Sequence, residues 1–177
     1  MLDAGFRPGR IIVAGDSAGG GLAAALLVAV RDRGRPAPAG AALLSPLLDL
    51  AATGETMITN AAVDPMVSLS NARLNVARYL GPDGDPRNPL ASPLYADLAG
   101  LPPLLIQVGS AECLLDDSRR FADRAQRAGV AVDLEIWDDM IHVWHVFAPM
   151  LDEGQWAIDA IGKFARAKVA SELVTSA

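Results

Sequence analysis

The chain has 177 residues, of which 51% are hydrophobic, enough for one domain with a buried core, and no apolar run is long enough to predict a membrane span. Its 15 basic and 21 acidic residues give a net charge of −6, which argues against nucleic acid as a partner. A single cysteine, Cys113, excludes an internal disulfide and favours a cytoplasmic location, and with only two histidines it predicts no metal site.

The order of apolar runs indicates an α/β protein with a mostly parallel sheet flanked by helices. A β-branched run over 11–15 predicts a strand buried on both faces. The Ala- and Leu-rich stretch 17–33, followed by Gly34, predicts a helix. Later in the chain, we expect strands at 39–44, 104–109 and 131–137 and helices at 114–128 and 152–168.

The segment 51–99 differs from the rest of the chain, because it is interrupted by Gly, Pro and Asp turns yet is too apolar for a disordered linker. We interpret it as a partial cap insertion and connecting segment that lies over the sheet. It divides the core into 1–50 and 100–177. Within it, one helix is expected from about Ser70 to Leu80, with Ser70 as its N-cap.

A nucleophile elbow is predicted at Gly15-Asp16-Ser17-Ala18-Gly19, which has the Gly-x-Ser-x-Gly pattern between a strand and a helix. The serine must turn sharply, so we expect Gly15 and Gly19 to be required because no room remains for side chains there. The following helix begins at the serine, so the Ala18 N–H would donate to an oxyanion. The rival interpretation, a phosphate-binding loop, lacks the Gly-Lys-Ser/Thr and Gly-x-Gly-x-x-Gly patterns.

In sites built on a nucleophile elbow, the serine acts with an acid and a histidine, which follow it along the chain in that order. His142 lies directly after the last predicted strand and is the expected base, whereas His145 is expected to be a packing or supporting residue. Glu112 follows the third strand and is the expected acid, which would hold the tautomer of the imidazole. Asp116 is the alternative acid, although the first turn of a helix favours a carboxylate for its dipole alone.

The expected substrate-pocket residues lie beside the predicted nucleophile and base. They are Asp16, Trp144 and Phe147. Asp16 also has a simpler role as an anchor of the elbow, and Cys113 is expected to be a small packing residue.

Five stretches, in order, resemble the bacterial hormone-sensitive-lipase-like esterases, the type IV family of α/β-hydrolases. They are 15–23, 44–50, 88–94, 101–109 and 140–147. The resemblance implies hydrolysis of small carboxylic esters, usually with short acyl chains, without a cofactor. It also places the acid at Glu112 and the histidine at His142. Many relatives carry Asp-Pro-Leu where this chain has Glu112-Cys113-Leu114, which keeps Asp116 open.

Family members carry a cap segment, four strands and a His-Gly-Gly-Gly stretch upstream of the elbow, and this chain has no His-Gly pair. The resemblance therefore implies the C-terminal part of the fold, strands five to eight, with Ala18 as the remaining oxyanion donor. Losing one such donor costs about 3–4 kcal/mol. Our hypothesis is that this polypeptide alone is a poor esterase and forms homo-oligomers or aggregates through the open edge of the 11–15 strand. The alternatives are an impaired remnant that acts as a binding protein, and one half of a complementing pair.

Overall fold

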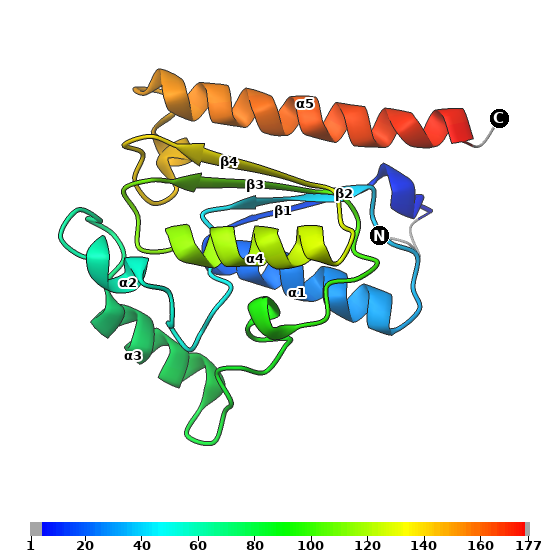
Figure 1. The fold of residues 1–177 in the computed structure, drawn as a ribbon. Coiled ribbons are helices and arrows are strands. Elements are labelled where there is room, and N and C mark those ends of the chain that lie inside the picture. Colours follow the sequence, from blue (N-terminus) through cyan, green and yellow to red (C-terminus); the bar gives the residue numbers. More distant parts are fainter. Residues whose placement is uncertain (1–4, 176–177) are drawn as a thin grey trace.

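The computed structural model describes residues 5–175, and a four-stranded parallel sheet forms its centre. The strands lie in the order of the chain: β1 (Ile12–Asp16), β2 (Gly40–Leu44), β3 (Leu104–Gly109) and β4 (Val132–Trp137). Asp16 lies opposite Leu44, and Gly109 lies opposite Trp137. Because all four strands run in one direction, their carboxyl ends meet at one edge of the sheet (Figure 1).

Helices cover both faces of the sheet, as predicted for an α/β fold. The helices α1 (Ala18–Asp32) and α4 (Leu115–Arg127) lie on one face, and α5 (Asp152–Thr175) lies along the other (Figure 1). Between the sheet, α1 and α4 the core is fully buried, with Leu27, Leu43, Ile106 and Phe121 among its members. Burial of each large apolar side chain contributes about 1.5–3 kcal/mol, so this layer is the main source of stability.

Strand β1 is less buried than the sequence predicts. Ala14 and Asp16 are exposed, and Ile12 and Val13 are only half-buried, so the prediction of a strand buried on both faces is wrong. The reason is its position at one end of the strand order. Within residues 5–175, β1 pairs with β2 alone, which leaves its other edge open.

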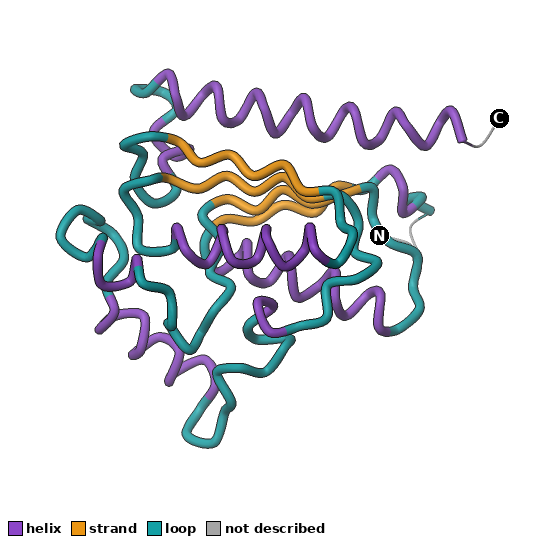
Figure 2. Tube along the Cα trace, viewed as in Figure 1, coloured by secondary structure: helices purple, strands orange, loops and turns teal. Residues whose placement is uncertain are grey.

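Residues 51–99 are largely loop (Figure 2). They contain α2 (Thr56–Thr59), α3 (Leu69–Leu80) and the short 3-10 helix η3 (Pro93–Tyr95). Contrary to the expectation that the segment lies over the sheet, η3 packs on α1 and α4, with Leu94 buried between them. The predicted helix is present, but its N-cap is Ser68 and not Ser70. The Asn71 N–H donates to the Ser68 hydroxyl at 3.3 Å.

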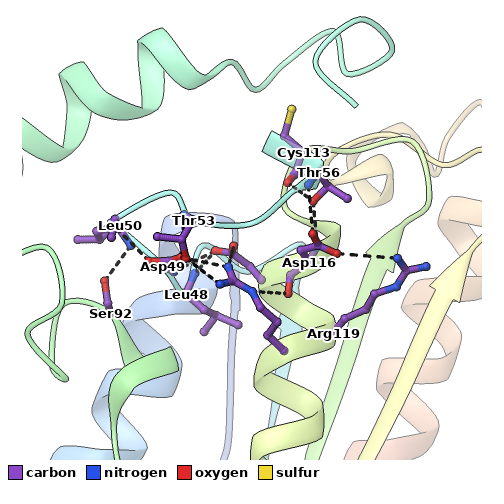
Figure 3. Close-up of polar contacts among 12 residues, drawn as sticks. Leu48, Asp49, Leu50, Thr53, Thr56, Ser92, Cys113, Asp116 and Arg119 are labelled. Atoms are coloured by element: carbon purple, nitrogen blue, oxygen red, sulfur yellow. Dashed lines mark hydrogen bonds and ion pairs between the residues drawn. The ribbon is translucent and has the colours of Figure 1, made fainter. Parts of the chain in front are cut away.

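A buried charge cluster ties the start of this segment to α4 (Figure 3). Asp117 accepts hydrogen bonds from the N–H groups of Leu48 and Asp49, both at 2.9 Å. The guanidinium of Arg120 lies 3.0 Å from the Asp49 carboxylate and 3.2 Å from that of Asp117. Asp49 also accepts a hydrogen bond from the Thr53 N–H at 3.0 Å. One guanidinium therefore serves two fully buried carboxylates.

Arg120 lowers the pKa of both carboxylates, yet their pKa values shift in opposite directions because their burial and other hydrogen bonds differ. Burial raises the pKa of Asp117 to about 7, and the nearby charge of Asp49 adds to the effect. Burial also acts to raise the pKa of Asp49. Hydrogen bonds from Thr53, Tyr95 and Arg120 outweigh it and hold the pKa of Asp49 below its ordinary value. Asp117 therefore binds a proton in the folded chain at pH values where an unfolded aspartate does not.

This difference predicts how stability changes with pH. Between the ordinary aspartate pKa of 3.8 and the folded value of about 7, the folded chain binds more protons at Asp117 than the unfolded chain. The contribution of Asp117 to the free energy of unfolding is therefore full below about pH 4 and is lost as the pH rises toward 7. Urea unfolding of the wild type and Asp117→Asn from pH 4 to 8 should show that the variant lacks this decline. The exposed Asp123→Asn serves as the matched control, and equal pH slopes in all three proteins would contradict the prediction.

Candidate active site

The turn predicted as a nucleophile elbow lies between β1 and α1. Ser17 has φ +52° and ψ −119°, a conformation that is uncommon and costly for a residue with a side chain. Two backbone hydrogen bonds hold it there: the Ser17 N–H donates to the Leu44 carbonyl at 2.8 Å, and the Leu47 N–H donates to the Ser17 carbonyl at 2.9 Å. The chain after β2 therefore fixes the position of the serine.

Close packing explains Gly15 and Gly21, but not Gly19. A Cβ on Gly15 would lie 2.2 Å from the carbonyl oxygen of Gly19. A Cβ on Gly21 would lie 2.1 Å from the carbonyl oxygen of Leu47. On Gly19 the nearest atom would be the Asp16 Oδ1 at 4.0 Å, so the prediction that Gly19 is required for space is wrong. Gly19 instead borders a cavity.

The structure brings Ser17, His142 and Glu112 together in one line. The Nε2 of His142 lies 2.9 Å from the Oγ of Ser17, and its Nδ1 lies 2.8 Å from Oε2 of Glu112. Both His142 and Glu112 are buried. An ionised carboxylate can only accept hydrogen bonds, so this arrangement assigns the proton to Nδ1 and leaves Nε2 to accept from the serine hydroxyl. Such a line can remove the hydroxyl proton as the oxygen attacks a carbonyl.

The carboxylate of Glu112 has two further partners. Its Oε1 accepts a hydrogen bond from the Gly109 N–H at 2.6 Å and another from the Ser45 hydroxyl at 2.8 Å. Three donors therefore compensate for the removal of this group from water. Sequence reasoning missed Ser45 as a partner of the acid, although two signals were available: it follows a strand directly, and it lies in the family-like stretch 44–50.

The alternative acid Asp116 and the second histidine, His145, have other partners. Asp116 lies in the first turn of α4 and accepts a hydrogen bond from the Thr56 N–H at 3.1 Å (Figure 3). It therefore holds residues 51–99, whereas the side chain of His142 bonds to Glu112 and Ser17. His145 lies 2.9 Å from Oε1 of Gln107, and burial lowers the pKa of its imidazole to about 4. His145 is therefore neutral at pH 7, in keeping with its expected packing or supporting role.

A cavity of about 600 Å³ opens beside Ser17 and His142. Its walls come from α1, from the chain after β2 and from α3. Most are apolar, including Leu22, Leu47, Leu50, Met66, Val67, Ala72, Val76, Leu90 and Leu114. Such a volume and character suit a small molecule with an apolar group.

The three residues expected to form this pocket do not line it. Trp144 is fully buried and packs against Trp137, with ring centroids 5.7 Å apart. Neither Asp16 nor Phe147 reaches the cavity wall. For Trp144 the error has a backbone cause, because Val143 has φ +51° and this left-handed residue redirects the chain directly after His142.

The cysteine thiol is not placed for chemistry. Cys113 is buried, its thiol lies 3.4 Å from the Val67 carbonyl, and burial raises its pKa to about 11, so it stays protonated. Among residues 5–175, no three His, Cys, Asp or Glu side chains are grouped to hold a metal ion. In the same range, no helix combines the length and apolarity needed to cross a membrane.

The sequence is similar to those of known hydrolases. A family model described as the α/β hydrolase fold matches residues 2–146. An acetyl-hydrolase of Streptomyces hygroscopicus is 49% identical over 166 residues, covering 94% of this chain and 55% of that protein. An esterase of Acinetobacter venetianus is 39% identical over 165 residues, covering 93% and 54%. The chain thus spans about half the length of the curated relatives it matches.

Solved structures show the same likeness. An esterase from the bacterial hormone-sensitive lipase family superposes with a TM-score of 0.93 at 55% identity, covering 95% of this chain and 56% of that one. The protein EstE5, soaked with p-nitrophenyl butyrate, gives a TM-score of 0.92 at 50% identity, covering 96% of this chain and 56% of that one.

The packing around the elbow predicts opposite results for two glycine substitutions. Gly21→Ala places a methyl group against a backbone oxygen and is expected to lower the free energy of unfolding by about 1–3 kcal/mol or more. Gly19→Ala meets open space and should change it by less than about 1 kcal/mol. Urea unfolding of both variants measures the difference, and equal losses would show that the elbow is not packed as described.

Proposed function

Because the chain belongs to the α/β-hydrolase family, we propose that it hydrolyses small carboxylic esters with short acyl chains, using Ser17 as the nucleophile, His142 as the general base and Glu112 as the acid. The observation that carries the proposal is the hydrogen-bonded line from Ser17 through His142 to a fully buried Glu112. Relatives named esterase and acetyl-hydrolase support the reaction class.

In the proposed reaction the ester carbonyl lies in the cavity above Ser17. The serine oxygen attacks while Nε2 of His142 takes its proton, and Glu112 stabilises the imidazolium without itself being protonated. The tetrahedral intermediate collapses as His142 returns the proton to the leaving alcohol. Water then attacks the acyl-enzyme with the same histidine as base, which releases the acid and restores the serine.

The start of α1 is the proposed source of charge stabilisation. Ala18 is the first residue of this helix and borders the cavity, so its N–H is the proposed donor to the developing oxyanion. The positive end of the helix dipole favours negative charge at the same point. Both effects act on the transition state more than on the neutral ester, and for that reason they accelerate the reaction.

The apolar walls are the proposed acyl site. Leu47, Leu50 and Val76 offer no charged group to a substrate, so the free energy of binding would come from burying the acyl chain. This lining favours an uncharged acyl group over a charged one.

The role of each residue can be tested with the full chain. Ser17→Ala and His142→Ala are expected to lower turnover of p-nitrophenyl butyrate by at least about 10³-fold, and Ser17→Ala should also prevent labelling by a fluorophosphonate probe. Glu112→Gln should lower turnover by about 10²–10⁴-fold, because it disturbs the histidine tautomer. Asp116→Asn is the matched control, since this carboxylate does not contact His142.

Two results would count against the proposal. A folded wild-type chain that takes up no probe at Ser17 would favour a binding protein over an enzyme. An equal loss in Asp116→Asn and Glu112→Gln would show that the acid is assigned to the wrong carboxylate.

A further inference from the structure

We propose that the turn after β2, residues 44–47, fixes the three reacting residues relative to one another, and that the Ser45 hydroxyl is its positioning group. This inference rests on the proposed function of Ser17, His142 and Glu112. Ser45 does not line the cavity, so it acts through the acid and the histidine loop and not on the substrate.

The turn first holds the nucleophile. The carbonyl of Leu44 accepts the N–H of Ser17, and the N–H of Leu47 donates to the carbonyl of Ser17. Both backbone polar groups of the nucleophile are therefore bound to the two ends of one four-residue turn. Ser45 lies between those ends, fully buried.

The Ser45 side chain then joins the other two residues. Its hydroxyl lies 2.8 Å from Oε1 of Glu112 and accepts the N–H of Val143, the residue after His142, at 3.1 Å. A backbone N–H can only donate and an ionised carboxylate can only accept. The hydroxyl proton is therefore directed to Glu112, and a single oxygen connects the acid with the loop that carries His142.

The backbone at this position indicates that the side chain is required. Ser45 has φ +44°, a region that glycine enters at no steric cost and that other residues enter rarely. Its N–H donates to the Gln107 carbonyl at 2.7 Å, which fixes the conformation. Glycine would suit the backbone better but would supply no hydroxyl. A strained residue at a reacting centre is therefore best explained by what its side chain does.

Loss of the hydroxyl has a specific consequence. Glu112 would retain the Gly109 N–H and His142 as partners, but its Oε1 would lose one of two donors, and the buried Val143 N–H would be left unpaired. The carboxylate and the histidine loop could then move relative to each other, which weakens alignment of the imidazole. The cavity walls would stay as they are, so kcat should fall while KM changes little.

Three substitutions in the full chain separate the hydroxyl from the backbone. Ser45→Ala and Ser45→Gly both remove the hydroxyl, but only glycine relieves the positive φ, and Ser45→Cys keeps a weak donor of similar size. The readouts are kcat and KM for p-nitrophenyl butyrate, the rate of Ser17 labelling by a fluorophosphonate, and the downfield proton resonance of His142 Nδ1–H. Circular dichroism and thermal unfolding verify that each variant is folded.

We expect kcat and the labelling rate to fall about 10- to 100-fold in both Ser45→Ala and Ser45→Gly, with KM within about twofold and the Nδ1–H resonance lost or shifted. Ser45→Cys should lie between these variants and the wild type. Wild-type kcat and resonance in Ser45→Gly would overturn the proposal, because the backbone alone would then matter. A rise in KM without a fall in kcat would also overturn it.

Failure of the proposed function gives a different pattern. If the folded wild type is not labelled, the enzymatic role is wrong, and the Nδ1–H resonance alone then tests the positioning: an unchanged resonance in Ser45→Ala overturns it, and a lost one supports it. If Ser45→Ala and Ser45→Gly do not fold, Ser45→Cys decides. Wild-type kcat and resonance in that variant overturn the proposal, and a partial loss of both supports it.

Discussion

The arrangement of the sheet edge depends on one buried negative charge, the carboxylate of Glu112. No water reaches it, so protein donors must compensate for its lost hydration, and they come from three separate segments: Gly109 at the end of β3, Ser45 after β2 and His142 after β4. All three can meet only if the parallel strands keep their register. Removing one partner from a buried charge typically costs about 3–5 kcal/mol. Displacing any of these strands would therefore raise the free energy of the folded chain.

Backbone strain gathers at the same edge. The non-glycine residues with positive φ among residues 5–175 include Ser17, Ser45 and Val143. Ser45 bonds directly to Glu112, Val143 follows its partner His142, and Ser17 is linked to it through His142. The loops at this edge also approach closely, because a Cβ on Gly109 would lie 2.0 Å from a carbonyl oxygen of the loop after β4. Strained residues persist only where many contacts determine the conformation, and the hydrogen bonds around the carboxylate supply them.

Sequence patterns predicted the elements that depend on near neighbours. Strands, helices and the elbow follow from short-range periodicity, and Glu112 and His142 follow from their positions after strands. Ser45 could not be found in this way, because its role depends on a residue 67 positions away. The inward position of Trp144 was also missed, since a single left-handed residue before it decides its direction. Long-range contacts and isolated backbone reversals leave little trace in composition or spacing.

The segment 51–99 connects the walls of the cavity with the loop that carries Glu112. Side chains of Thr56, Asn60 and Asp64 all bond to backbone atoms of the loop 110–113, at distances of 2.7–3.0 Å. Figure 3 shows the bond from Thr56 to Cys113. The same segment supplies α3, which lines the cavity and buries none of its own residues. A lightly packed wall is therefore tied to a tightly bound loop. Helix α3 therefore has few contacts that restrain it, whereas side-chain bonds to 110–113 hold the loop that carries Glu112.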